Sequence, residues 1–169
     1  MLRTLAPLIG ALGGFKMCLN LFLGSTNPLP EREENDLNVG PLRPSQSVIC
    51  RWFATPHVQV VGAHTGCSCG FPSVRAETII EPFEGLWADN EERIDDLRSV
   101  TALIDLLREA LKVTEQIELF PVWEGEEESP PKGRIEWSLH DLVPERVLFN
   151  EGYLYVVRKQ NRPAPKQSA

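Results

Sequence analysis

The chain has 169 residues, 42% of them hydrophobic, and a formal net charge of −7 at pH 7. This length is close to the roughly 150 residues of an ordinary domain, and the apolar content is sufficient for a buried core. The negative charge disfavours nucleic acid and anionic membranes as partners, and no apolar run reaches the roughly 18 residues of a membrane-spanning helix. We therefore expect a soluble domain.

The first sixteen residues differ in character from the rest of the chain. They carry Arg3, an apolar run and two adjacent glycines, and they contain no acidic residue. Such a segment resembles a short signal peptide without a clear cleavage site, or it is an extension upstream of a start at Met17. We predict an extension over 1–16, one globular domain over 17–159 and a disordered, polar tail over 160–169.

Cysteine usage bears on the location of the protein. Four cysteines are too few for a disulfide scaffold in a chain of this size, so we expect a reducing, cytoplasmic location. Export is the alternative, if residues 1–16 act as a signal peptide. The sequence gives no indication of the oligomeric state.

The first predicted elements are strands separated by a long loop. An apolar run over 16–23 indicates a buried strand that carries Cys18. Four prolines and a charged run predict a surface loop over 27–47, because this composition resists both helix and strand. Two β-rich runs follow, at 48–53 and at 57–63, and a proline separates them.

The clearest element is an amphipathic helix over 90–112, where apolar residues recur at three- and four-residue steps. After it, alternating runs at 116–123 and 134–139 predict a hairpin with a long acidic loop, 124–133, between its strands.

The last predicted elements form a second hairpin. Short apolar runs at 147–149 and 153–157 flank a three-residue turn that ends on Gly152, a position suited to the left-handed conformation. Together, the elements predict an α+β fold, with a mainly antiparallel sheet, one long amphipathic helix packed on one face, and the cysteine motif at a sheet edge or end.

The chemically distinctive segment runs from His64 to Phe71 and reads His-Thr-Gly-Cys-Ser-Cys-Gly-Phe, directly after the predicted strand over 57–63. Its glycines let the backbone curl tightly around a small site. Thiolates and imidazole are ligands that zinc and iron accept, and Cys18 or Cys50 would supply a fourth ligand. The predicted zinc or iron ligands are His64, Cys67, Cys69 and Cys18.

Other interpretations of this motif stay open. In a redox site, Cys67 or Cys69 would be a thiolate beside His64, and the second thiol would resolve the product. A disulfide across one residue is strained and easily reduced. A lone cysteine nucleophile with a histidine base has no recognisable acid partner here. In a structural interpretation, the cysteines pack as small apolar side chains beneath Phe71.

The acidic loop offers a function of another class. Its glutamates at 124, 126, 127 and 128 lack the oxygen spacing of a calcium loop. The alternative prediction is a noncatalytic interaction protein that binds a basic protein partner through this loop, weakly at high salt, with a purely structural cysteine turn.

At Met17-Cys18 and at Gly66-Cys-Ser-Cys-Gly-Phe71, the chain resembles a family of small uncharacterised bacterial proteins. The resemblance covers most of 17–159 and implies no mechanism. It favours a start at Met17 over a signal peptide. It also implies that the cysteines at 18, 67 and 69 belong to one site.

Overall fold

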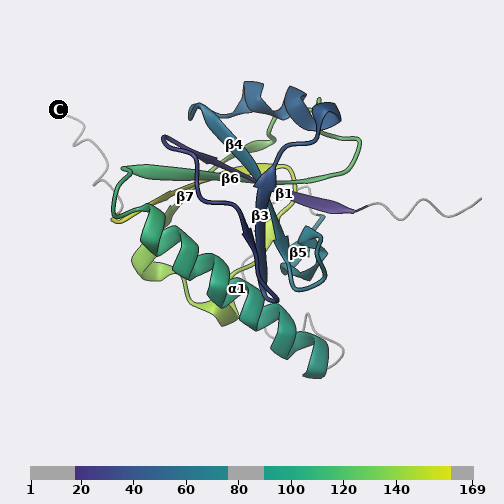
Figure 1. Ribbon diagram of the computed structural model, residues 1–169, viewed down its shortest axis with the longest axis vertical. Coiled ribbons are helices and arrows are strands. Elements are labelled where there is room, and N and C mark those ends of the chain that lie inside the picture. The colour runs from purple at the N-terminus through teal and green to yellow at the C-terminus, as the bar shows by residue number, and fades with distance from the viewer. Residues whose placement is uncertain (1–17, 76–89, 161–169) are drawn as a thin grey trace, which may run out of the picture.

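The computed structural model describes residues 18–75 and 90–160 (Figure 1). Predictions for residues 1–16, for a start at Met17 and for the tail beyond residue 160 lie outside the described residues. The strands are β1 (Leu19–Ser25), β2 (Arg32–Glu33), β3 (Leu37–Pro41), β4 (His57–Ala63), β5 (Ser73–Val74), β6 (Gln116–Trp123), β7 (Gly133–Ser138), β8 (Phe149–Asn150) and β9 (Tyr153–Arg158). The helix α1 spans Asn90–Ala110, and 3-10 helices span Pro44–Trp52, Ser68–Gly70, Leu139–Asp141 and Pro144–Arg146.

The main sheet has seven strands in the order β2-β3-β4-β1-β6-β9-β7. Every neighbouring pair is antiparallel except β7 and β9, which run parallel. A second, two-stranded sheet pairs β5 with β8 in parallel. The predicted α+β class, with a mainly antiparallel sheet and one long helix on one face, is confirmed.

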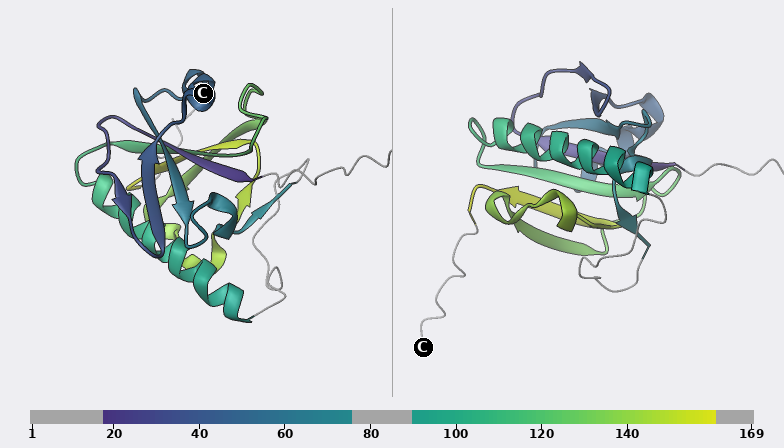
Figure 2. Two further views of the ribbon diagram at one scale, coloured as in Figure 1. Left: turned by 45° about the vertical axis from the view of Figure 1, so that its right-hand side comes forward. Right: turned by 90° about the horizontal axis from the view of Figure 1, so that it is seen from below.

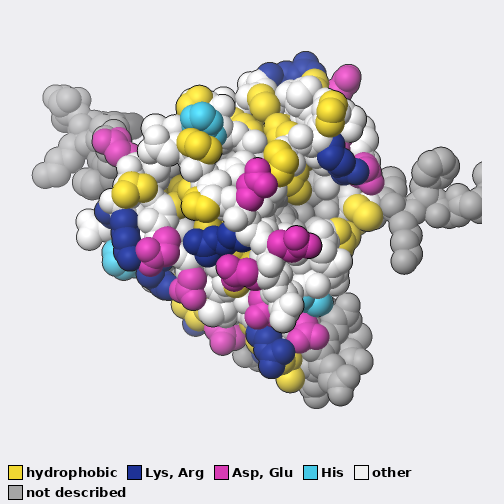
Figure 3. Space-filling view, in the orientation of Figure 1, with side chains coloured by type: hydrophobic (Ala, Val, Ile, Leu, Met, Phe, Trp, Pro, Cys, Tyr) yellow, Lys and Arg dark blue, Asp and Glu magenta, His cyan; other side chains and the backbone are white. Residues whose placement is uncertain are grey.

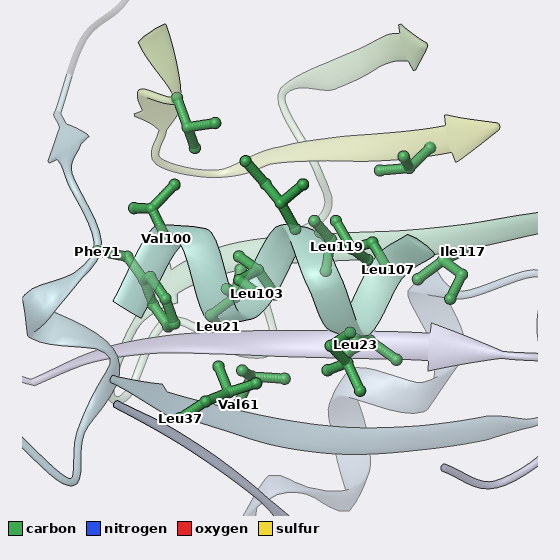
Figure 4. Close-up of a cluster of buried hydrophobic side chains, with 14 of the residues drawn as sticks. Leu21, Leu23, Leu37, Val61, Phe71, Val100, Leu103, Leu107, Ile117 and Leu119 are labelled. Atoms are coloured by element: carbon green, nitrogen blue, oxygen red, sulfur yellow. The ribbon is translucent and has the colours of Figure 1, made fainter. Parts of the chain in front are cut away.

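Two apolar clusters lie on the two faces of the main sheet (Figures 1 and 2). Leu21 and Leu23 of β1 face α1, whereas Phe22 between them faces the 3-10 helix Pro44–Trp52, as the alternation of side chains along a strand requires. On the α1 side, strand and helix side chains point toward one another, and Figure 4 labels Leu21, Leu23, Leu37, Val61, Phe71, Val100, Leu103, Leu107, Ile117 and Leu119.

The apolar stripe of α1 is buried from Val100 onward, whereas Ile94 near its start is exposed. Val100, Leu103, Leu107 and Leu111 are all buried at three- and four-residue steps. The helix ends at Ala110, whose carbonyl oxygen accepts hydrogen bonds from the N–H and the hydroxyl of a threonine four residues later. Among the described residues, no helix is both long enough and apolar enough to cross a membrane.

Two predictions in the N-terminal half are wrong. The expected loop over 27–47 contains β2 and β3, because none of its prolines falls before the last residue of β3 within these strands, and Leu37 and Val39 alternate into the core. The run 48–53 forms part of a 3-10 helix and no strand. Proline at the start of that helix pre-sets its first turn, and Ile49 is the apolar residue that it buries.

Both predicted hairpins are also wrong, because each strand finds a partner elsewhere. β9 lies between β6 and β7, so these two strands do not pair with each other. β8 pairs with β5 instead of β9. Gly152 does adopt a positive φ of 81°, but its N–H donates to the carbonyl oxygen of Pro121 in β6. The turn is therefore held by the neighbouring strand.

Candidate functional site

The cysteine motif lies at one end of the main sheet, where β1 and β4 separate. The hydroxyl of Ser68 joins the two strands at that point, since it donates to the carbonyl oxygen of Val61 at 2.6 Å and accepts from the N–H of Leu21 at 2.7 Å. Leu21 and Val61 are the last paired residues of these strands. One residue beyond Ser68, the sulfur of Cys69 accepts from the N–H of Leu19 at 3.4 Å. Beyond the point where β4 separates from β1, the motif therefore supplies the hydrogen-bond partners that β4 would otherwise give to β1.

The turn that carries the motif closes on the end of β4. The N–H of Ala63 donates to the carbonyl oxygen of Cys67 at 2.8 Å, and the N–H of Gly66 donates to the carbonyl oxygen of Ala63 at 2.9 Å. Gly66 has a φ of 78°, a conformation that glycine adopts without the strain of a side chain. The predicted position of the motif, at the turn leaving the strand 57–63 and at an end of the sheet, is confirmed.

The two cysteines of the motif are in contact. The sulfur of Cys67 accepts from the N–H of Cys69 at 3.4 Å and lies 3.3 Å from the hydroxyl of Thr65, which also donates to the carbonyl oxygen of Cys67 at 3.1 Å. A backbone N–H and a hydroxyl therefore lie against one sulfur, and the N–H stabilises its thiolate.

The pKa values of the two thiols shift in opposite directions. Partial burial raises the pKa of Cys67, but hydrogen bonds from Thr65 and from the thiol and N–H of Cys69 lower it below its ordinary value. Burial, the hydrogen bond to Cys67 and the charges of Cys67 and Cys18 raise the pKa of Cys69 to about 11. Cys67 consequently ionises first, and Cys69 keeps its proton as a donor to it.

Cys18 lies beside this pair. It directly precedes β1, instead of lying within the strand as predicted, and its carbonyl oxygen accepts from the N–H of Glu124 at 2.9 Å. Its neighbour Leu19 contacts the sulfur of Cys69. The remaining cysteine, Cys50, belongs to the 3-10 helix that covers the other face of the sheet. Three of the four cysteines are therefore gathered in one place.

The thiols are accessible. Cys69 is exposed, Cys67 and Cys18 are half-buried, and Phe71 is the member of the motif whose ring enters the core.

His64 does not join the thiols. Its Nδ1 lies 3.1 Å from the hydroxyl oxygen of Ser99 and 3.8 Å from a carboxylate oxygen of Asp96, both on α1, and its backbone N–H donates to the same hydroxyl. Within residues 18–75 and 90–160, no group of three or more His, Cys, Asp or Glu side chains is placed to hold a metal ion. The assignment of zinc or iron ligands stays a prediction.

Histidine, serine and aspartate side chains meet here, but not as a hydrolytic triad. In such a triad the two ring nitrogens of the histidine contact different partners, whereas Ser99 and Asp96 both approach Nδ1 of His64. Ser99 is also fully buried, out of reach of a substrate. The contact instead fastens the cysteine turn to α1.

Two serines that build the site, Ser68 and Ser99, are absent from the site residues that the sequence predicts. Ser99 falls on the buried stripe of α1, where a polar residue needs a hydrogen-bond partner, and that position was the available signal.

Most glutamates of the acidic loop interact with other groups of this chain. Glu124 pairs with Arg43 at 3.2 Å, and Glu126 pairs with Arg75 at 2.6 Å. Glu127 is buried and accepts from the N–H of a neighbouring glycine at 2.7 Å. On the face shown in Figure 3, acidic side chains lie among basic ones and form no single acidic patch.

Comparisons with protein-family models, with curated proteins and with solved structures find no match to this chain. Kinship with the bacterial family stays a prediction from the motif.

Proposed function

We propose that the cysteine motif is a redox-active thiol site that performs thiol–disulfide exchange, with Cys67 as the nucleophile. The observation that carries this proposal is the approach of the Cys69 N–H, at 3.4 Å, and of the Thr65 hydroxyl, at 3.3 Å, to the sulfur of Cys67. The thiolate is the reactive form of cysteine, and such hydrogen bonds favour it.

The reaction is an exchange with a disulfide-bearing substrate. The Cys67 thiolate attacks one substrate sulfur, an S–S bond forms between them, and the other substrate sulfur leaves as a thiolate. A second protein thiol, deprotonated, then attacks the Cys67 sulfur and releases the remaining substrate sulfur as a thiolate. The substrate disulfide is reduced by two electrons, and the protein dithiol is oxidised to a disulfide.

The metal interpretation has less support, because the predicted ligand His64 forms a hydrogen bond with Ser99, and no group of three or more His, Cys, Asp or Glu side chains in the described part of the chain is placed to hold a metal ion. The interaction protein also has less support, because Glu124 and Glu126 already pair with arginines of this chain. Elemental analysis of protein purified without tag or chelator tests the metal directly: stoichiometric zinc or iron that is lost with Cys67 and Cys69 would replace the redox proposal.

The proposal is tested by alkylation with limiting iodoacetamide at pH 7, followed by mass spectrometry of each cysteine. We expect Cys67 to be labelled before Cys50, an exposed cysteine outside the site. Thr65→Val should slow the labelling of Cys67, because it removes one hydroxyl from the thiolate. Thr101→Val, which removes an exposed hydroxyl on α1, is the matched control. Equal labelling of Cys67 and Cys50 would rule out an activated nucleophile.

A further inference from the structure

We infer that the three clustered cysteines act in sequence, so that oxidation entering at Cys67 passes through Cys69 and ends as a disulfide between Cys18 and Cys69. This inference rests on the proposed thiol–disulfide exchange and assigns the resolving residues for it. It makes Cys18 part of the reacting site, although that residue is 49 positions away from Cys67 in the sequence.

The order of the sulfurs follows from the contacts of Cys69. On one side, its N–H donates to the sulfur of Cys67 at 3.4 Å. On the other side, its sulfur accepts from the N–H of Leu19 at 3.4 Å. Cys69 therefore lies between Cys67 and the start of β1, where Cys18 is found.

Cys18 is within reach of Cys69. The nitrogen of Leu19 is joined to the carbonyl carbon of Cys18, so the Cα of Cys18 is about 2.4 Å from that nitrogen and at most about 6 Å from the sulfur of Cys69. The Cα atoms of a disulfide lie about 4.4 to 6.8 Å apart, and rotation of the Cys18 and Cys69 side chains, with a shift of the turn that carries Cys69, brings the two sulfurs together. The hydrogen bond from the N–H of Glu124 holds the Cys18 backbone in this position.

The first disulfide within the protein joins Cys67 and Cys69, and we do not expect it to be the final product. Only Ser68 separates the two cysteines, and a disulfide across one residue is strained and easily reduced. Cys18 belongs to a different segment of the chain, so a disulfide to it escapes this constraint. Transfer to Cys18 therefore relieves strain and returns Cys67 to its reactive state.

Each transfer is a balanced exchange. The Cys69 sulfur, deprotonated, attacks Cys67 in its mixed disulfide with the substrate, and the substrate sulfur leaves as a thiolate. The Cys18 sulfur, deprotonated, then attacks Cys69, the new S–S bond forms, and Cys67 leaves as a thiolate. No further oxidant is required, because the substrate disulfide has accepted both electrons.

The test uses oxidised glutathione as the disulfide, on the full chain, with thiols blocked at successive times and tryptic peptides mapped without reduction. Trypsin places Cys18 on peptide 17–32, Cys50 on 33–51, and Cys67 with Cys69 on 52–75. We expect glutathione first on Cys67, and then a cross-link between 17–32 and 52–75 that fragmentation assigns to Cys69. Peptide 33–51 serves as the internal control and should stay out of the cross-link.

Variants separate the steps. Cys18→Ser should stop at an internal disulfide within 52–75, and Cys69→Ser should retain glutathione on Cys67 without a cross-link. Wild-type protein that ends at the internal disulfide, or a cross-link assigned to Cys67, would overturn the inference while leaving the proposed exchange intact. Absence of any preferred glutathione adduct at Cys67 would instead overturn the proposed function. The wild-type map decides the matter even if a variant fails to fold.

Discussion

Replacing Ser68 with alanine tests how the cysteine motif is built into the sheet. The Ser68 hydroxyl is buried, donates to the carbonyl oxygen of Val61 and accepts from the N–H of Leu21. Alanine leaves both backbone groups buried without that partner. Each unpaired buried group costs about 1 to 3 kcal/mol, so the free energy of unfolding should fall by about 2 to 6 kcal/mol.

A loss of this size is a large part of the roughly 5 to 15 kcal/mol that stabilises a domain. Urea unfolding followed by tryptophan fluorescence measures it, as a lower midpoint with an unchanged slope. Ser47→Ala is the matched control, because that exposed serine also donates to a backbone carbonyl oxygen, and its effect should stay within about 0.5 kcal/mol. A Ser68→Ala protein as stable as this control would refute the bridging role of the hydroxyl.

Three further changes test the core and the site. Tyr155→Phe removes the acceptor of a buried backbone N–H and should cost about 1 to 3 kcal/mol in urea unfolding. Because burial raises the pKa of Tyr155, the stability it contributes is present below pH about 10 and lost as pH rises through that pKa, a loss that the phenylalanine variant should lack. Gly70→Ala places a Cβ 2.7 Å from a ring carbon of His64 and should cost about 1 to 3 kcal/mol, whereas Gly40→Ala, with open space around it, serves as the control. Because the pKa of Cys67 is lowered, its alkylation rate should rise at lower pH in folded protein than in urea, and coincident profiles would contradict this.

The sequence predicted the elements whose side chains follow one simple period. The strands over 57–63 and 116–123 and the helix that starts at Asn90 lie where their apolar patterns predict them. β3 was missed because the segment that contains it is rich in proline. That composition argues against a strand and obscures one of only five residues. The pairing of β6, β7 and β9 could not be predicted from their order along the chain. β9 lies between β6 and β7 in the sheet, and no local sequence signal encodes that arrangement.

The site was predicted in part for a similar reason. Cys67 and Cys69 are close in sequence, so their proximity follows from the motif itself. The contact of His64 with Ser99 depends on how α1 packs on the sheet, and no spacing within the motif predicts it.

The position of β9 also constrains the order in which the protein assembles. β7 is synthesised before β9 but borders no other strand of the described main sheet. During synthesis, residues 133–138 therefore have no strand partner until β9, which also pairs with β6, has been made. We therefore expect the edge of the sheet that carries β7 to form only once β9 is available to pair with it.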